Sequence, residues 1–233
     1  MDKLPPDNPV ISLDAHRTLA DRVCSQLKHD IIIGKLPQGS KILEEDLAKV
    51  YGSSRGPLRE AIRRLEGMRL VVRTPNAGAR VVTLTETMMA EVYVVRESLE
   101  GMSARLAAQQ MTSEEIEALW ALLDQHEHSI DDADGKVYFQ REGDLDFHYR
   151  IAIGSKNQWL IQLLSSELYQ LIRMCRHCSS RLPSRPTAAL SEHRQIVDAI
   201  AKRDAELAEL LMRRHISNAW NIVKELLPGQ AHD

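Results

Sequence analysis

Residues 42–82, ILEEDLAKVYGSSRGPLREAIRRLEGMRLVVRTPNAGARVV, decide the fold of the first third of this 233-residue chain. Within them, residues 44–51 form a short amphipathic pattern that predicts a helix. Gly52 suits a sharp turn after it, because glycine tolerates a left-handed backbone. A second helix is expected to begin at once. Ser54 can cap its free amide groups, and Pro57 falls in its first turn, where a missing N–H costs little.

The second helix is predicted to have two contrasting faces. Apolar residues recur at i, i+3, i+4 and i+7 and should form one buried stripe: Leu58, Ala61, Ile62 and Leu65. Arginines recur every four residues on another side: Arg55, Arg59 and Arg63. At about 100° per residue they span roughly 80° of the helix surface, so they should face outward together.

Such a basic row is what reading of the DNA major groove requires. A guanidinium can donate two hydrogen bonds to a guanine edge or clamp a phosphate. The alternative interpretation is a solvated basic face, which is the usual explanation of a charge run. The sequence that follows the helix favours the first interpretation.

Two short strands are predicted after the second helix, at residues 70–73 and 79–83, around a turn-rich tip at 74–78. Residues 15–33 read as a preceding helix that ends at Gly34 and would complete a three-helix core. Helix, turn, helix and hairpin in this order predict a winged helix-turn-helix. Double-stranded DNA is therefore the first partner to consider.

The charge distribution supports this division of the chain. Residues 1–83 hold fourteen Lys and Arg against ten Asp and Glu, a balance of +4, and the remainder holds sixteen against twenty-three, or −7. Residues 52–80 alone contain seven arginines and two acidic residues. The near-neutral total therefore conceals a local basic region suited to phosphate.

Length and composition bound the class of protein. A hydrophobic content of 43% over 233 residues allows two domains with substantial cores. We expect a flexible arm at residues 1–14, the winged domain at 15–83 and a second domain at 84–233. The sequence has no apolar run of membrane-spanning length and no apolar core of a secretion signal, which predicts a cytoplasmic protein without membrane association. Three cysteines, an odd number, do not indicate a disulfide framework.

The second domain shows helical periodicity with little strand character, so the fold class is mainly α: a winged helix-turn-helix followed by an all-helical bundle. Thr85 is expected to cap the first bundle helix, and Thr112 with Glu115 forms a capping box at the second. The helices are predicted near residues 86–109, 112–130, 135–154, 158–181, 186–202 and 204–227.

Polar residues placed where a core should be are the most informative feature of the bundle. Asp144 and His148 are four residues apart and should share one helical face. His193 and His215 each lie in the middle of an apolar stripe, where an unpartnered imidazole would be costly. Three neutral imidazoles and a carboxylate suit a divalent transition metal, with zinc, nickel and manganese not distinguished. The hypothesis is that these four side chains converge on one ion.

The alternative is a set of core histidines that are hydrogen-bonded and bind no metal. His126 also falls on an apolar face, yet it has no acidic partner one turn away on that face. Cys175 and Cys178 have the Cys-x-x-Cys spacing, but a second pair of ligands is missing, and we interpret both as structural.

These segments resemble a known family. The first part of the chain is similar to the winged-helix domain of the GntR family of bacterial transcription regulators, whose signature resembles LEEDLAKVYGSSRGPLREAIRRLEG (residues 43–67). The second part resembles the FCD domain, the helical effector-binding and oligomerisation domain of the FadR-type branch. The supporting segments are VVRESLEGMSARLAAQQ (94–110), DLDFHYRIAIGSKNQWL (144–160) and EHRQIVDAIAKRDAELAELLMRRHI (192–216).

The resemblance implies a homodimer that binds a short palindromic operator, as a repressor in our interpretation, and changes its affinity when a small organic acid enters the helical domain. It implies the same four metal ligands, and it implies that Arg96 faces the effector, with an i,i+4 pair to Glu100 as the structural alternative. Arg55 and Arg59 match the DNA-contacting arginines, and Gly78 matches the wing-tip glycine. With Arg63 and Ser54 these form the predicted DNA-binding set. Glu45 departs from relatives that have a third DNA-reading arginine at this position.

The sequence is also compatible with two other functions. A metal-dependent hydrolase could use the same ion to activate water, although no further carboxylate or histidine is clearly placed as a general base, and we predict that the chain is not an enzyme. A regulator with a metal-free effector pocket would use Arg96 and polar neighbours instead. Turnover assays would distinguish the hydrolase from a regulator. Metal analysis would distinguish the metal-free regulator from the metal-binding one.

Overall fold

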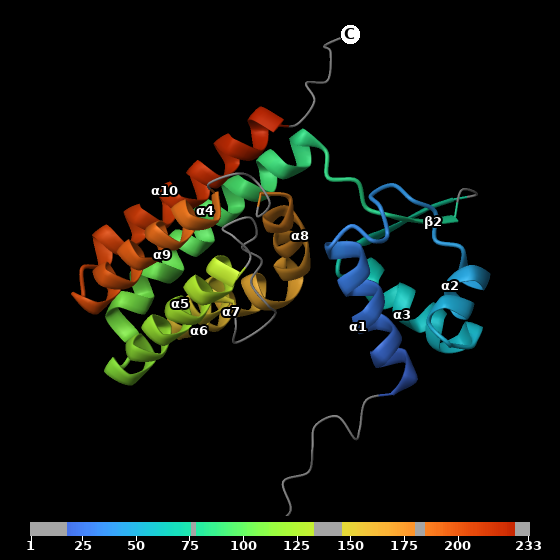
Figure 1. Cartoon of the computed structure of the whole chain (residues 1–233), viewed down its shortest axis with the longest axis horizontal. Helices are drawn as coiled ribbons and strands as arrows, with labels where there is room; N and C mark the ends of the chain where they lie inside the picture. The colour runs from blue at the N-terminus through green and yellow to red at the C-terminus, as the bar shows by residue number, and fades with distance from the viewer. Residues whose placement is uncertain (1–17, 76–77, 133–145, 180–184, 227–233) are drawn as a thin grey trace, which may run out of the picture.

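The computed structural model describes residues 18–75, 78–132, 146–179 and 185–226. It has two lobes (Figure 1), an N-terminal lobe that carries the hairpin and a second lobe made of helices. The fold is mainly α, as predicted. No helix among the described residues is long and apolar enough to cross a membrane.

The N-terminal lobe consists of three helices and a two-stranded antiparallel hairpin. Helix α1 packs on α3, α2 packs on α3, and α3 contacts the hairpin. The strand register runs from Val71 opposite Val81 to Thr74 opposite Gly78, and Lys41 adds an isolated bridge to Arg80. The elements are α1 (Leu19–Ile32), α2 (Glu44–Val50), α3 (Arg55–Gly67), β1 (Val71–Thr74) and β2 (Gly78–Val81).

Helix α3 shows the two predicted faces. The apolar stripe is fully buried, with each side chain at most 1% exposed: Leu58, Ala61, Ile62 and Leu65. The arginine row on the other side is exposed: Arg55, Arg59 and Arg63. Burial of the stripe against α1 and α2 therefore fixes which side of α3 faces solvent.

The turn between α2 and α3 follows the prediction in one respect and corrects it in another. Gly52 has the expected left-handed backbone, with φ of 58°. Ser54 is the N-cap residue of α3, but its side chain makes no capping hydrogen bond within the described chain. The Ser53 hydroxyl instead donates to the Ser54 carbonyl at 3.0 Å. Because Ser54 is exposed, water can satisfy the first amides of the helix.

The second lobe is built around α4 and α10, which run side by side (Figure 1). Helix α9 packs against α10, α5 and α4, while α6 packs against α4 and α5. The predicted caps of α4 and α5 are confirmed: the Thr85 hydroxyl accepts from the Met88 amide, and Thr112 and Glu115 bond each other reciprocally. The helices are α4 (Glu86–Gln110), α5 (Ser113–Asp132), α6 (Phe147–Gly154), α7 (Gln158–Gln162), α8 (Tyr169–Ser179), α9 (Arg185–Ala201) and α10 (Ala205–Leu226).

The single helix predicted over residues 158–181 is wrong. A π-helical segment, η3 (Leu163–Glu167), separates α7 from α8. The Ser165 and Ser166 hydroxyls donate to the carbonyls four residues earlier, Ile161 and Gln162. Such bonds compete with the α-helical ladder, and this gives a physical reason for the interruption.

The helix predicted over residues 135–154 is also corrected at its start. Helix α6 begins at Phe147, because Asp146 is the N-cap with extended backbone angles and accepts the amides of His148 and Tyr149. Residues 135–145 lie outside the described part of the chain. Asp144 lies before this cap, outside the described residues, so its predicted position beside His148 stays a prediction.

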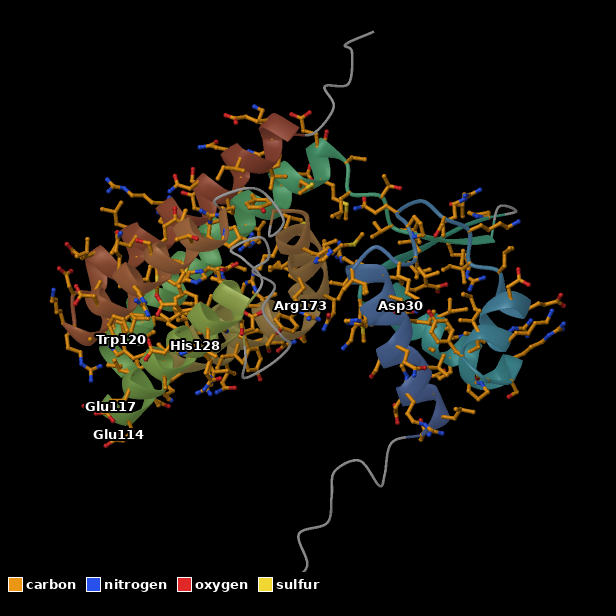
Figure 2. The ribbon with its side chains drawn as sticks, viewed as in Figure 1. Asp30, Glu114, Glu117, Trp120, His128 and Arg173 are labelled. Carbon is orange, nitrogen blue, oxygen red and sulfur yellow. The ribbon has the colours of Figure 1, made fainter. Side chains whose placement is uncertain are left out.

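Helices α1 and α8 are in contact where the two lobes meet. Figure 2 places Asp30 of α1 and Arg173 of α8 on the sides of the lobes that face each other. Asp30 is buried and accepts a hydrogen bond of 2.6 Å from the Tyr51 hydroxyl and one of 3.0 Å from Lys35 Nζ. A buried carboxylate thus ties the end of α1 to the end of α2.

We predict that Leu65→Ala lowers the free energy of unfolding by about 2–5 kcal/mol, because it leaves a cavity under α3. Arg63→Ala, on the exposed side of the same helix, should change it by no more than about 0.5 kcal/mol. Urea unfolding followed by circular dichroism measures both. Equal effects of the two substitutions would contradict the assignment of the faces.

Candidate metal centre and nucleic-acid interface

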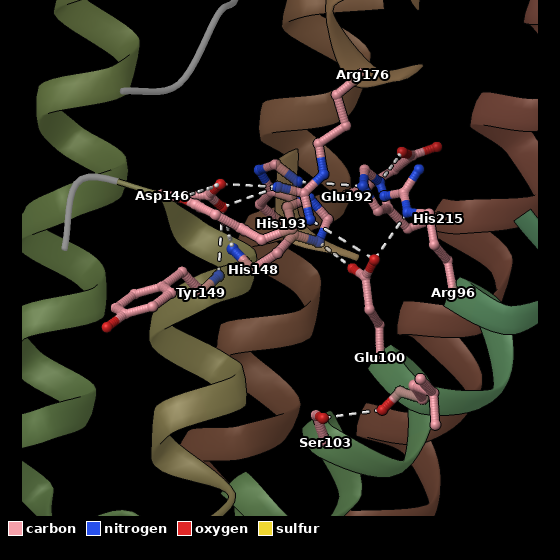
Figure 3. A network of polar contacts seen from close by, with 12 residues as sticks. Arg96, Glu100, Ser103, Asp146, His148, Tyr149, Arg176, Glu192, His193 and His215 are labelled. Carbon is pink, nitrogen blue, oxygen red and sulfur yellow. Dashed lines mark hydrogen bonds and ion pairs between the residues drawn. The ribbon is translucent and has the colours of Figure 1, made fainter. Parts of the chain in front are cut away.

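Three buried histidines from three helices meet inside the second lobe. His148 comes from α6, His193 from α9 and His215 from α10, and they are 6%, 1% and 4% exposed. One ring nitrogen of each lies within 4.8 Å of the other two, and Nε2 of His193 is 3.2 Å from Nε2 of His215. Figure 3 shows the three rings together. The structure thus brings together three of the four predicted ligands, and Asp144 lies outside the described residues.

Local structure positions each ring. Because Asp146 caps α6, His148 is held in the first turn of that helix, with its amide 3.0 Å from the Asp146 carboxylate. The neighbouring Phe147 ring stacks on His193, with ring centroids 4.0 Å apart. His193 follows the apolar stripe of α9 predicted from the sequence, where Leu190, Ile196 and Val197 are buried.

Two carboxylates hold the outer nitrogens of two histidines. Nδ1 of His215 lies 2.6 Å from Oε2 of Glu192, and Nδ1 of His148 lies 2.6 Å from Oε2 of Glu100. An ionised carboxylate only accepts, so each contact favours a proton on Nδ1 and leaves Nε2 with its lone pair. Carboxylate–histidine pairs of this kind orient metal-binding imidazoles in proteins.

Burial keeps the histidines neutral. It is the largest cause of the lowered pKa of His148, about 3, with Arg176 contributing, and it also drives the pKa of His193 well below the usual value. The pKa of His215 is lowered by burial as well, although Glu192 opposes the shift. Burial would raise the pKa of Glu100, but Arg96 and His148 outweigh it and hold that pKa well below its usual range. The lone pairs of the imidazoles are therefore available at neutral pH.

These residues fit a divalent transition metal. Two nitrogens bound to one ion at about 2.0–2.1 Å lie roughly 3 Å apart, close to the spacing seen between His193 and His215. The donors are neutral nitrogens with carboxylates behind them, and such donors suit zinc and nickel better than manganese, which prefers oxygen. Among the described residues, these three histidines form a group whose ring nitrogens could hold one ion.

Arg96, predicted to face an effector, is 1% exposed and donates from Nε to Glu100 at 2.8 Å. The i,i+4 pair named as the structural alternative therefore exists. The guanidinium also lies over the Tyr93 ring, 4.8 Å from its centroid. Nη1 of Arg96 is buried without a hydrogen-bond partner among the described residues. One donor thus remains beside the histidine cluster.

Sequence reasoning missed the acidic residues that surround the histidines. Asp146 is 1% exposed and contacts Arg176 Nη1 at 2.8 Å and the Tyr169 hydroxyl at 3.2 Å, in addition to capping α6. These donors occupy its oxygens. An aspartate just before an apolar helical run is a cap signal that could have identified it. Glu100 and Glu192 carry no such signal, because the histidines that they contact lie on other helices.

The predicted DNA-binding residues lie on the surface of the N-terminal lobe. The side chains of Arg55 and Arg59 are 64% and 61% exposed, and each pairs with a glutamate of α2: Arg55 with Glu45 and Arg59 with Glu44. Arg63 and Ser54 are exposed as well, and Gly78 opens β2 with a φ of 81°. A recess of about 360 Å³ between α2, α3 and β1 is lined by Glu44, Arg59, Arg63, Glu66 and Arg73.

Two family profiles match the chain. The profile described as "Bacterial regulatory proteins, gntR family" matches residues 19–81, and the profile "FCD domain" matches residues 91–218.

Curated relatives match over most of their length. An uncharacterised HTH-type transcriptional regulator YdhC of Bacillus subtilis is 30% identical over 87% of this chain and 90% of its own. A probable D-xylose utilization operon transcriptional repressor of Paenarthrobacter nicotinovorans is 28% identical, covering 92% and 90%. Among solved structures, E. coli McbR/YncC superposes with a TM-score of 0.72 at 20% identity, covering 91% of this chain and all of that one. At that identity the likeness concerns the fold.

We expect the metal-free protein to lose stability as the pH falls below 6.5. The unfolded chain takes up a proton at His148 near pH 6.5, whereas the folded chain does so only near pH 3. Between these values the unfolded state binds more protons, so acid favours unfolding by up to about 1.4 kcal/mol per pH unit for this group.

Urea unfolding between about pH 7 and pH 5 in the presence of a chelator measures this slope. His148→Gln should make it shallower, whereas His128→Gln, at an exposed position, should not change it. An equal slope in wild type and His148→Gln would show that His148 is not held neutral.

Proposed function

Because the chain belongs to the GntR family of bacterial transcriptional regulators and carries an FCD domain, we propose that it is a ligand-responsive repressor that binds a palindromic operator as a homodimer. The family consists of regulators, not enzymes, so the hydrolase alternative is set aside. The GntR domain binds DNA, and the FCD domain binds a small-molecule effector. We further propose that the protein acts in the cytoplasm.

The arginine row of α3 supports the proposed DNA contact. Its buried stripe fixes the helix on the lobe, and Arg55, Arg59 and Arg63 project into solvent on the other side. Guanidinium groups on an exposed second helix suit guanine edges and phosphates. In the proposed arrangement Ser54 contacts DNA at the start of α3, and Gly78 lets the wing approach it. A dimer would present two such helices and fix the spacing of the half-sites.

The convergence of three neutral, buried imidazoles is the observation that carries the effector proposal. We propose that His148, His193 and His215 hold a divalent transition metal, with Asp144 as the fourth ligand. When bound, the ion supplies a Lewis-acidic centre with coordination positions for the carboxylate of a small organic acid. Glu100 and Glu192 orient the imidazoles, and their own charges are balanced by Arg96 and Arg185.

Arg96 is proposed as the second contact of the acid. Its Nε donates to Glu100, but the N–H groups of the buried Nη1 have no acceptor among the described residues. A carboxylate bound beside the histidines would supply that acceptor. An unpaired buried donor is costly, so an acid that pairs with it gains that energy on binding.

Helix α8 connects the proposed effector site with the N-terminal lobe. Arg176 of α8 contacts Asp146 at 2.8 Å and Glu100 at 3.6 Å, and α8 packs against α1. Helix α1 in turn packs on α3. An acid can alter DNA affinity only if it favours one arrangement of the lobes over another. We propose that the acid acts through a shift of α8.

A regulator without metal is the second candidate, and one observation favours it. His215 has a contact at each ring nitrogen in the absence of an ion, with Glu192 at Nδ1 and with His193 Nε2 at Nε2. In that case Arg96 alone would contact the acid. Metal analysis of the purified protein separates the two candidates.

We predict that Arg59→Ala abolishes operator binding and leaves the dimer folded. Each dimer loses the contact twice, at about 1–3 kcal/mol for each base contact. Gel-shift titration with a duplex selected by the wild-type protein from a random pool measures the loss, and size-exclusion chromatography checks the dimer. Lys202→Ala, which removes a positive charge in the second lobe, is the control. Normal binding by Arg59→Ala would refute α3 as the recognition helix.

His193→Ala should strip metal from the purified protein, because two imidazoles remain of the three described here. Elemental analysis of wild type and variant measures the metal content, and His128→Ala, at an exposed position, is the control. Undiminished metal content would remove His193 from the ligand set. A thermal-shift screen of organic acids on metal-loaded and chelated wild type then tests the effector, since a ligand that needs the ion stabilises only the loaded protein.

A further inference from the structure

The first turn of α2 places two adjacent glutamates against the arginines of α3. We propose that they act on DNA binding in opposite directions: Glu44 orients Arg59 for base reading, whereas Glu45 competes with DNA for Arg55. The inference rests on the proposed role of α3 and adds two residues that set the balance between operator and non-operator binding.

Glu44 holds Arg59 through the inner nitrogen of the guanidinium. Nε of Arg59 donates to Oε2 of Glu44 at 2.7 Å, and Glu44 is only 28% exposed because it lines the recess between α2, α3 and β1. Arg59 itself is 61% exposed. Bonding through Nε leaves the two terminal nitrogens at the exposed end, and these are the donors that pair with a guanine edge. The pair thus favours one orientation of Arg59 before DNA binds.

Glu45 holds Arg55 through an outer nitrogen. The pair joins Nη2 of Arg55 to Oε1 of Glu45, and both side chains lie at the surface, 64% and 71% exposed. A phosphate or base that takes both terminal nitrogens of Arg55 must therefore displace this carboxylate. Exposed pairs are weak, so the competition is modest and discriminates against sites that offer only phosphates.

Charge alone would give both glutamates the same effect on DNA affinity, because each adds one negative charge near the duplex. Glu44 occupies Nε of Arg59, whereas Glu45 occupies a terminal nitrogen of Arg55. We therefore predict that the two glutamates change DNA affinity in opposite directions. This contrast makes the two residues matched controls for each other.

The test measures binding of the full-length dimer to two fluorescent duplexes by anisotropy at several salt concentrations. One duplex is the operator selected from a random pool, and the other is a scrambled duplex of the same composition. Glu45→Ala should tighten binding to the scrambled duplex about two- to fivefold. Glu44→Ala should weaken binding to the operator about two- to tenfold, the cost of ordering one long side chain on binding.

Three further variants isolate the cause. Glu44→Gln keeps an acceptor for Arg59 Nε and should restore much of the operator affinity. Glu45→Ala should have no effect in an Arg55→Ala background, because its partner is gone. Glu60→Ala removes the same charge from α3 beside Arg64, away from the two pairs, and should leave both affinities unchanged. Thermal unfolding checks that each variant is folded.

Tighter operator binding by Glu44→Ala would overturn the orienting role, and unchanged binding of the scrambled duplex by Glu45→Ala would overturn the competing role. Equal changes in Glu44→Ala, Glu45→Ala and Glu60→Ala would reduce the effect to net charge and overturn both. Normal operator binding by Arg59→Ala overturns the DNA-reading assignment itself. Loss of binding by Arg59→Ala with equal effects at Glu44 and Glu45 overturns only this inference.

Discussion

Keeping three imidazoles neutral in the interior of the bundle is the constraint on which the second lobe depends. A buried ring nitrogen needs a partner, and the structure supplies carboxylates at His148 and His215. Glu100 is itself buried and Glu192 is only 21% exposed, so both need cations, which explains why Arg96 and Arg185 lie in the core, 1% and 5% exposed. Charge compensation therefore extends outward from the histidines until it reaches α8 through Arg176.

The N-terminal lobe obeys a different constraint. Its helices are fixed mainly by apolar burial, and the fully buried stripe of α3 sets the side on which the arginines lie. Apart from the buried Asp30, its described charged residues lie nearer the surface, where pairs such as Arg55 with Glu45 exchange readily with a polyanion. One lobe thus uses ionic groups as internal structure, and the other uses them as an exchangeable surface.

Periodicity and turn chemistry predicted much of the fold. Leu58 and Leu65 mark the buried side of α3, Gly52 marks the turn before it, and the Thr112 box marks the start of α5, because these signals act over a few residues. The apolar surroundings of His193 and His215 predicted their burial. The partners of those histidines could not be predicted, because Glu100 and Glu192 meet them across helix pairs whose packing no local pattern encodes. The predicted start of α6 was wrong for a related reason. The Asp146 carboxylate caps the helix and also pairs with Arg176, thirty residues further along the chain.

The π-helical segment has a geometric effect on everything that follows it in the chain. A π turn closes its hydrogen bonds one residue later than an α turn, so it inserts one extra residue into the helical repeat. One residue corresponds to about 100° of rotation around the axis. A rotation of this size about the axis of α8 would turn Arg176 away from Asp146, which it contacts at 2.8 Å. The hydrogen bonds of Ser165 and Ser166 thus help to set the orientation of α8, and with it the direction of Arg176.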